Sequence, residues 1–232
     1  MANPCELIVA LDVPGADDVR AVLDILPAEI RWYKVGLELF SAEGPPVLQV
    51  LHDRQKHIFL DLKLHDIPNT VAAAIQAIAR HKVDLLTVHA AGGSAMLRAA
   101  AESTRRHAGP KLIAVTTLTS LSADDLQSVG IQRSISEQAQ ALGALSLESG
   151  IDGLVCSPLE AASLRATFGP ESLLVTPGIR LAGDAVGDQK RIATPSEAAR
   201  NGSNYIVAGR SLLHAKDPAQ AALNLLADLR AW

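Results

Sequence analysis

The sequence predicts one (β/α)8 TIM barrel of the α/β class, and two observations favour this fold. The chain alternates short runs rich in Val, Ile and Leu with longer alanine-containing stretches of helical spacing. Eight such runs follow one another at broadly similar intervals, as in a barrel of ordinary size. An open doubly wound sheet is the alternative, but no GxGxxG motif follows the first run. We therefore expect residues 1–232 to form a single barrel domain.

The predicted strands are short, and a helix fits between each strand and the next. The interval before residue 152 is wider than the others and has room for an extra helix. In chain order, the strands are expected at ELIVALD (6–12), RWYKVG (31–36), HIFLDLK (57–63), DLLTVH (84–89), KLIAVTTL (111–118), DGLVCS (152–157), SLLVTPG (172–178) and YIVAGR (205–210).

Composition limits the classes of protein that fit this chain. Its 232 residues are 48% hydrophobic and carry a formal net charge of −4, which fits a soluble domain with a large core and no nucleic-acid partner. Cys5 and Cys156 have no spacing typical of a zinc site. The sequence has neither an evident signal peptide nor an apolar segment of membrane-spanning length. The expected location is the cytoplasm.

The segment DLKLHDIPNT, residues 61–70, is the most informative part of the chain. Side chains alternate along an extended strand, so Asp61 and Lys63 project to the same side, and Asp66 follows just past the strand. Asp12 and Lys34 form a second acid and base pair near the ends of two earlier strands. Charges at such positions are costly unless they meet one another, so we expect a charged cluster.

A barrel gathers its active site at the C-terminal ends of its strands. Charged, hydroxyl and loop-forming residues of this chain fall at or near those ends. They are Asp12, Lys34, Asp61, Lys63, His89, Thr119, Ser157, Pro177, Arg180, Gly209 and Arg210. Among them, His89 is expected to be a hydrogen-bonded structural residue rather than a catalytic base.

Taken singly, these residues also have structural explanations. Asp66 could cap the helix that follows it, and Asp61 with Lys63 could be an isolated ion pair. Thr119 and Ser157 could be hydroxyls that cap loops. Two lysines and three aspartates on one rim, however, are difficult to explain by packing alone.

The last third of the chain predicts a phosphate site. Loops after strands seven and eight of such barrels commonly bind phosphate through backbone N–H groups. Gly209 allows close approach of the backbone, and Arg210 could hold the anion with paired donors. Arg180 and Gln189 lie on a loop long enough to fold over a ligand. A merely flexible surface loop is the alternative.

Over nearly its whole length, the chain resembles the orotidine 5′-phosphate decarboxylase family. Its motifs occur in the family's order, and the segment at 61–70 is the most specific of them. They are ALD, YKVG, DLKLHDIPNT, TTLTS, VCSP, TPGIR, GDQKR and VAGR.

The resemblance implies roles for the charged residues. Lys63 would deliver a proton to the pyrimidine C6 after carbon dioxide leaves, and Asp61 would lie beside the substrate carboxylate. Lys34 and Asp66 would complete an alternating charge network. The active sites of a homodimer would be shared, with Asp66 and Thr70 reaching the neighbouring subunit.

The resemblance also implies a substrate-binding set and no metal or organic cofactor. Asp12 and Lys34 would hold ribose hydroxyls. Thr119 would lie near the nucleotide, and Ser157 would bond the amide edge of the pyrimidine. Ile67, which follows Asp66, and Pro177 also belong to the set. The substrate phosphate would be held by Gln189, Gly209 and Arg210, with Arg180 nearby.

Three other functions remain open from the sequence. A magnesium-dependent lyase or synthase acting on sugar phosphates shares an Asp-x-Lys-x-x-Asp pattern. An aldolase could use Lys63 as a Schiff-base nucleophile, although flanking carboxylates should keep that lysine protonated. A non-catalytic barrel could bind a phosphate ligand as a sensor.

Overall fold

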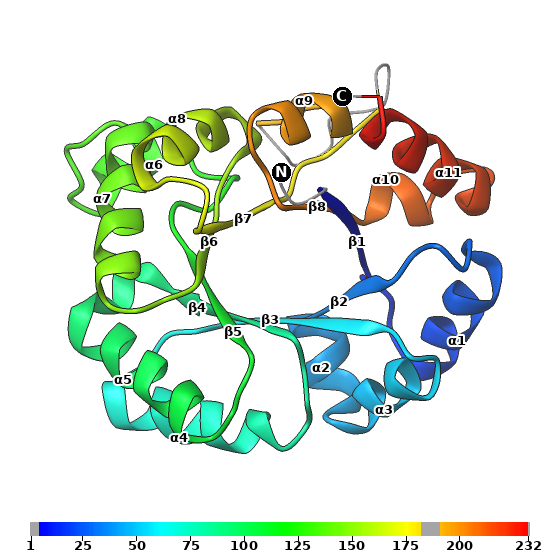
Figure 1. Cartoon of the computed structure of the whole chain (residues 1–232), viewed down its shortest axis with the longest axis horizontal. Coiled ribbons are helices and arrows are strands. Elements are labelled where there is room, and N and C mark those ends of the chain that lie inside the picture. Colours follow the sequence, from blue (N-terminus) through cyan, green and yellow to red (C-terminus); the bar gives the residue numbers. More distant parts are fainter. Residues whose placement is uncertain (1–4, 182–190, 232) are drawn as a thin grey trace.

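Eight parallel strands close into a barrel, and helices surround it. A computed structural model describes residues 5–181 and 191–231 of the chain. Each strand pairs with the next, and the eighth pairs with the first, so the sheet closes on itself (Figure 1). The predicted TIM barrel is confirmed. The strands are β1 Glu6–Ala10, β2 Trp32–Gly36, β3 His57–Leu64, β4 Leu85–His89, β5 Lys111–Val115, β6 Gly153–Val155, β7 Leu173–Thr176 and β8 Tyr205–Ala208.

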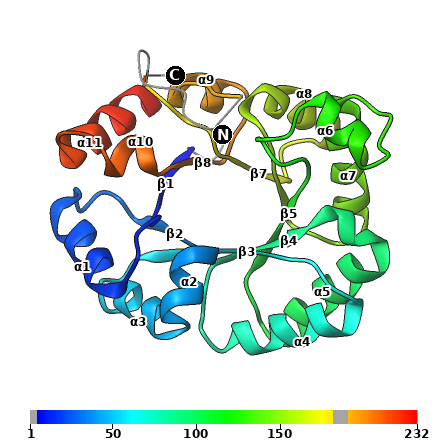
Figure 2. The ribbon, with the colours of Figure 1, turned by 180° about the vertical axis from the view of Figure 1, so that it is seen from behind.

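Helices cover the outside of the barrel on all sides, as both axial views show (Figure 1, Figure 2). The wide interval between β5 and β6 holds two helices, α6 and α7, which confirms the extra helix expected there. The helices are α1 Ala16–Ile25, α2 Leu37–Glu43, α3 Pro46–Asp53, α4 Pro68–Ala79, the 3₁₀ turn η1 Ala90–Gly92, α5 Gly93–Arg106, α6 Ala123–Ser128, α7 Ile135–Glu148, α8 Pro158–Phe168, α9 Pro195–Arg200, α10 Arg210–Leu213 and α11 Pro218–Leu229.

Local sequence determines where many of these helices begin. A proline occupies the first helical position of α4, α8 and α11, where its missing N–H costs no hydrogen bond. Capping boxes, in which a Ser or Thr and an acidic residue three positions later exchange hydrogen bonds with the backbone, start α6, α7, α8 and α9.

The core has two layers because strand side chains alternate between the inside and the outside of the barrel. The outer layer packs the strands against the helices, and alanines such as Ala100 and Ala101 let these helices approach closely. The inner layer fills the barrel itself. Its buried members are Ile8, Ala10, Trp32, Phe59, Leu85, Ile113, Val175 and Val207.

Several strands end earlier than the sequence predicted. Strand β5 ends at Val115 rather than at residue 118, and β6 ends at Val155 rather than at residue 157. The residues beyond these ends therefore belong to loops at the C-terminal rim, where the alternation of a strand no longer determines their direction.

An irregularity between β3 and β4 lies directly under the charged motif. Leu60 pairs with Leu86, and the next pair is Leu64 with Val88. Residues 61–63 of β3 therefore lie opposite a single residue of β4, Thr87. Bulges of this kind redirect side chains and are common beside active sites.

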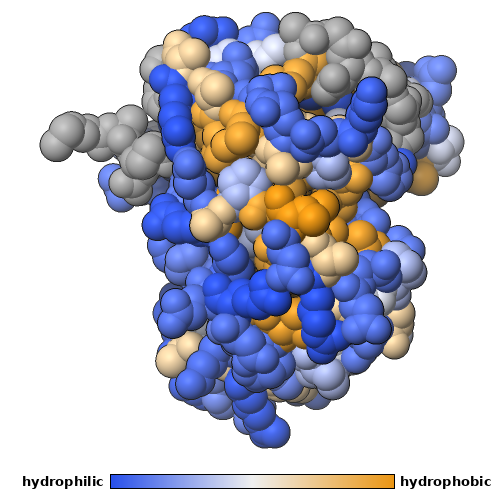
Figure 3. All heavy atoms as spheres, turned by 90° about the vertical axis from the view of Figure 1, so that its right-hand side faces the viewer, coloured by the Kyte–Doolittle hydropathy of each residue, from blue (hydrophilic) through white to orange (hydrophobic). Residues whose placement is uncertain are grey.

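The outer surface is largely polar, as expected for helices that bury one face. On the side drawn in Figure 3, hydrophilic residues cover most of the surface, and apolar residues form separate patches among them, the most prominent near the middle. Within residues 5–181 and 191–231, no helix has both the length and the apolar character needed to cross a membrane.

Candidate active site

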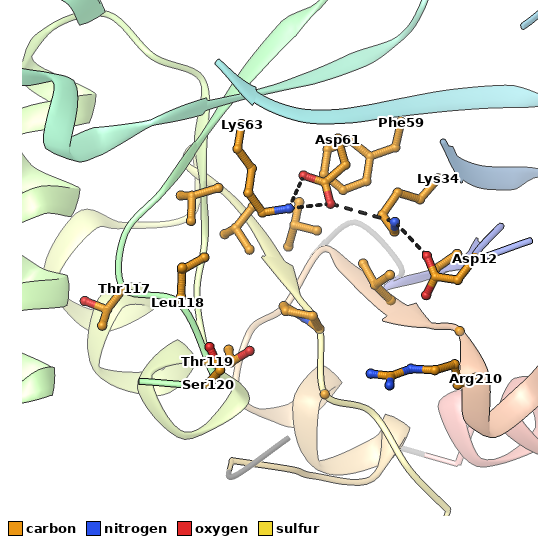
Figure 4. Close-up of a pocket in the computed structure, with 18 of the residues that line it drawn as sticks. Asp12, Lys34, Phe59, Asp61, Lys63, Thr117, Leu118, Thr119, Ser120 and Arg210 are labelled. Atoms are coloured by element: carbon orange, nitrogen blue, oxygen red, sulfur yellow. Dashed lines mark hydrogen bonds and ion pairs between the residues drawn. The ribbon is translucent and has the colours of Figure 1, made fainter. Parts of the chain in front are cut away.

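A cavity of about 310 Å³ opens at the C-terminal ends of the strands. Its floor is apolar and includes Phe59 and Val175, whereas its walls carry charged and hydroxyl groups (Figure 4). Most of the residues expected in the site meet here. They are Asp12, Lys34, Asp61, Lys63, Thr119, Pro177, Arg180, Gly209 and Arg210.

Four charged side chains form an alternating row along one wall of the cavity (Figure 4). The Lys63 ammonium nitrogen lies 2.9 Å from both carboxylate oxygens of Asp61. The Lys34 ammonium is 3.9 Å from Asp61 Oδ2 and donates a hydrogen bond of 3.2 Å to Asp12. The row of base, acid, base and acid thus crosses β3, β2 and the end of β1. This arrangement excludes the isolated ion pair considered for Asp61 and Lys63.

The middle of the row is the least accessible to water. The side chains of Asp61 and Lys34 are 13% and 12% exposed, against 33% for Lys63 and 38% for Asp12. Desolvated charges of opposite sign interact more strongly than exposed ones, so the row is held in place. Lys63 remains accessible from the cavity.

Lys63 has an unusual backbone conformation. Its φ angle is +50°, in the left-handed region that residues with a side chain seldom adopt. Such strain persists only where the surroundings impose it, and it gathers at functional sites. Here it accompanies the irregular pairing of β3 with β4 and turns the lysine toward Asp61.

Two glycines make room for the charged row. A Cβ atom at Gly36 would lie 2.6 Å from the Lys34 ammonium nitrogen, and one at Gly209 would lie 2.9 Å from Asp12 Oδ2. Neither glycine has a positive φ, so the space they leave matters here rather than backbone freedom. Both lie within motifs singled out from the sequence, yet the role of Gly36 was not apparent there.

The loop after β5 forms another wall of the cavity. Leu118, Thr119 and Ser120 all line it (Figure 4). Arg191 supports this loop: it donates a 3.1 Å hydrogen bond to the Leu118 carbonyl and forms a largely buried ion pair with Glu160. Ser120 was not expected in the site, although it directly follows Thr119. Arg191 was not expected because no local pattern pairs it with Glu160.

Arginines occupy the side of the cavity near β7 and β8. Arg210 is the first residue of α10, and its side chain extends into the cavity from the side opposite Lys63 (Figure 4). Arg180 is buried, and its guanidinium donates to the Ile179 carbonyl and to Ser211 Oγ. Gln189, expected beside them, lies outside the described residues.

Three expected site residues do not line the cavity of their own chain. Asp66, Ile67 and Thr70 are exposed at the start of α4, and Ile67 is 66% exposed. The carboxylate of Asp66 accepts a hydrogen bond of 2.6 Å from the Ile67 amide but does not occupy the cap position of the helix. Within the described part of the chain, all three side chains are open to solvent.

Ser157 lies at the start of α8, beyond the end of β6. Because β6 ends at Val155, Ser157 is instead the N-cap of α8: it is fully buried, and its hydroxyl accepts from the Leu159 amide. It is not among the residues that line the cavity. This contact fits the capping role considered as the alternative, and the bond to the pyrimidine stays a prediction.

His89 is structural, as expected. Its Nδ1 accepts from the Ala91 amide at 3.3 Å and so begins the turn η1, while its ring stacks on His65. Burial lowers the pKa of His89, and the neighbouring His65 and Lys63 lower it further. The ring is therefore neutral near pH 7, as acceptance at Nδ1 requires.

Comparison with known proteins gives this geometry a context. A family model described as "Orotidine 5'-phosphate decarboxylase / HUMPS family" matches residues 6–225. The chain belongs to this family. It is 47% identical to the orotidine 5′-phosphate decarboxylase of Opitutus terrae over 97% of this chain and 99% of that protein. It is 46% identical to the decarboxylase of Moorella thermoacetica, over 97% and 92% of the two chains.

Solved structures of similar proteins have the same barrel. The crystal structure of orotidine 5′-phosphate decarboxylase from Lactobacillus acidophilus superimposes with a TM-score of 0.86 at 38% identity, covering 98% of this chain and all of that one. An uncharacterized conserved protein from Geobacillus kaustophilus gives a TM-score of 0.83 at 39% identity, covering 96% and 99%. The resemblance stated from the motifs is confirmed.

Proposed function

We propose that this protein decarboxylates orotidine 5′-monophosphate to uridine 5′-monophosphate and carbon dioxide, the last step of de novo pyrimidine nucleotide synthesis, with no metal or organic cofactor. The observation that carries the proposal is the row Lys63, Asp61, Lys34 and Asp12 along one wall of a cavity that two arginines also line. Membership of the decarboxylase family supports the same reaction.

The proposed chemistry requires an ammonium group at the reacting carbon. Loss of carbon dioxide from C6 leaves a carbanion on an sp² carbon, which the pyrimidine ring does not delocalise. A positioned cation can stabilise that charge and then quench it as a general acid. In our proposal Lys63 does both, because it is accessible from the cavity while Asp61 holds its ammonium in place.

Magnitudes rank the two effects that the charged row could supply. Two unit charges about 4 Å apart interact by about 4 kcal/mol at an effective dielectric constant near 20. Repulsion between Asp61 and the substrate carboxylate is therefore small beside the roughly 8–23 kcal/mol by which enzymes lower barriers. We therefore assign most of the barrier lowering by the row to stabilisation of the carbanion by Lys63.

The remaining cavity residues would bind the non-reacting parts of the nucleotide. Arg210 and Gly209, with Arg180 nearby, would hold the phosphate at a distance from Lys63, and Gln189 is expected to join them. Asp12 and Lys34 would contact the ribose, with Thr119 and Pro177 against the bound nucleotide. Binding energy from the phosphate would then keep the reacting ring against the charged row.

We further propose that the enzyme is a homodimer with shared sites. Asp66, Ile67 and Thr70 are exposed at the C-terminal rim although the resemblance assigns them to the site. If these residues entered the cavity of a neighbouring subunit, their exposure in a single chain would be explained. Asp66 would then add another acid to the row, next to the partner's lysine. The cytoplasmic location expected from the sequence stays a prediction.

An absorbance assay with orotidine 5′-monophosphate in excess EDTA tests the proposed activity. We expect the ultraviolet absorbance to change as product forms, at the same rate with and without the chelator. A requirement for added Mg²⁺ would favour the sugar-phosphate lyase. Borohydride trapping of substrate on Lys63 would favour the aldolase. Binding of the nucleotide without turnover would favour the sensor.

A further inference from the structure

Thr87 contacts both ends of the Asp61–Lys63 pair, although it belongs to none of the sequence motifs. It lies on β4 and is fully buried. Its hydroxyl accepts a hydrogen bond of 2.8 Å from the Lys63 amide and donates one of 2.9 Å to Asp61 Oδ1. We propose that Thr87 is a positioning residue for the reaction, which fixes the Asp61 carboxylate and through it the Lys63 ammonium; the inference rests on the proposed function.

The irregular strand pairing explains why a side chain is needed here. Between the pairs Leu60–Leu86 and Leu64–Val88, three residues of β3 face one residue of β4. The regular ladder is interrupted at Lys63, whose φ of +50° departs from an extended strand. A buried amide without a partner is costly. The Thr87 hydroxyl supplies that partner.

The direction of the hydroxyl proton follows from this first hydrogen bond. The Lys63 amide can only donate, so the Thr87 oxygen must accept from it. The hydroxyl proton is then free to point to Asp61 Oδ1, a carboxylate oxygen that also receives the Lys63 ammonium. The contacts close a ring from the Lys63 backbone through Thr87 and Asp61 to the Lys63 side chain. An acceptor and a donor are both required, and one hydroxyl provides them.

This ring predicts an effect on turnover rather than on substrate binding. Thr87 is not among the residues that line the cavity, whereas the proposed phosphate and ribose contacts come from β1, β2 and the loops after β7 and β8. Loss of the hydroxyl should let the Asp61 carboxylate rotate and should leave the Lys63 ammonium less well placed. The Michaelis constant should change little.

Replacement of Thr87 by Val, Ser and Cys tests the proposal. Val keeps the shape but removes the hydroxyl, Ser keeps the hydroxyl, and Cys keeps a similar volume with a much weaker donor and acceptor. Thr176→Val is the matched control, because Thr176 is equally buried on β7 and bonds Ser203 and the Tyr205 carbonyl, away from the charged row. Each variant's kcat and KM are measured with orotidine 5′-monophosphate, and its folding is followed by circular dichroism.

We expect Thr87→Val to lower kcat by about tenfold to a hundredfold, the usual effect of losing a hydrogen bond to a charged group, with KM within about threefold. Thr87→Ser should restore kcat to near the wild-type value, and Thr87→Cys should fall between. Thr176→Val should keep the wild-type kcat. Wild-type kcat in Thr87→Val, or in Thr87→Cys if the valine variant does not fold, would overturn the inference, as would equal losses in Thr87→Val and Thr176→Val.

A crystal structure of the valine variant separates this inference from the proposed function. We expect the Asp61 carboxylate to rotate away from its wild-type orientation, whether or not the wild type decarboxylates the nucleotide. An unchanged Asp61 and Lys63 would contradict the positioning role. Absence of wild-type turnover, in contrast, would contradict only the proposed reaction.

Discussion

At the residue scale, the site depends on how closely its charged side chains are confined. Asp61 receives both ammonium groups of the row as well as the Thr87 hydroxyl, and it is largely shielded from water. Lys63 pairs with the same carboxylate while keeping access to the cavity. A preorganised cation of this kind does not have to reorganise when negative charge develops beside it, and preorganisation is the main source of electrostatic catalysis.

The space at Gly36 leads to a prediction about Lys34. Gly36→Ala would place a methyl group 2.6 Å from the present position of the Lys34 ammonium, which would have to shift from its place between Asp12 and Asp61. We expect kcat/KM to fall by about tenfold or more, since a charge-assisted hydrogen bond is lost, with little change in melting temperature. Steady-state kinetics and thermal unfolding measure the two effects.

Gly15→Ala is the control for this substitution. A Cβ at Gly15 would also approach the end of one flexible side chain, Glu43 at 3.0 Å, which is not part of the charged row. It should leave kcat/KM unchanged. Full activity of Gly36→Ala would show that the Lys34 ammonium is not confined as the structure indicates.

Much of the site could be predicted from sequence at this scale, and the misses have physical causes. Asp61 and Lys63 were expected together because side chains two apart on a strand share a face. Thr87 and Gly36 act through contacts with other side chains of the barrel, which no local pattern reveals. Ser157 was expected at the end of β6 but caps α8, because the strand ends two residues earlier.

At the scale of elements, the strands were predicted well and their C-terminal ends were not. The apolar runs predicted all eight strands in order. The residues just beyond them, such as 116–118, are β-branched or apolar and continue the pattern of a strand. A strand ends where its neighbours stop offering hydrogen-bond partners, so its end depends on the barrel rather than on its own sequence.

His89, which accepts the first hydrogen bond of the turn η1, predicts that the stability of the fold depends on pH. Burial lowers the pKa of His89 in the folded protein relative to the unfolded chain. A lowered histidine pKa means that the folded state prefers the neutral ring. Its stabilising contribution is therefore present above the unfolded pKa of about 6.5 and is lost as the pH falls through the folded value.

His89→Asn should remove this dependence, because asparagine can accept the same amide hydrogen bond without titrating. We expect the wild-type free energy of unfolding to decline more steeply than that of the variant between about pH 7.5 and about pH 5.5. Urea unfolding at several pH values measures the difference. Parallel pH profiles would contradict the role assigned to the neutral ring.

At the scale of the whole molecule, barrel closure brings distant residues to one cavity. Asp12 and Arg210 lie near opposite ends of the sequence yet line the same cavity, because β8 pairs with β1. This gathering could be predicted once the fold was inferred, since every strand of a parallel barrel ends on the same rim. The depth of the cavity could not be predicted in this way, nor could the rim residues that face away from it.

The exposed residues at the start of α4 lead to a prediction for the assembled enzyme. If two subunits share each site, Lys63→Ala and Asp66→Ala are both nearly inactive alone, but a mixed dimer contains one intact site. Equal amounts of the two variants, dissociated and allowed to reassociate at random, should recover about a quarter of the wild-type activity. Gel filtration checks that dimers have formed again, and a turnover assay measures the recovered activity. Activity no greater than that of the separate variants would contradict the shared site.

The most direct test of the central claim is the kcat of Lys63→Ala. We predict a loss of at least about 10²–10⁴-fold, the usual contribution of a general acid, while uridine 5′-monophosphate still binds and the barrel stays folded. Lys111→Ala, at the opposite end of the barrel, should keep the wild-type kcat. Turnover of Lys63→Ala within a few-fold of the wild type would contradict the claim that this ammonium quenches the carbanion.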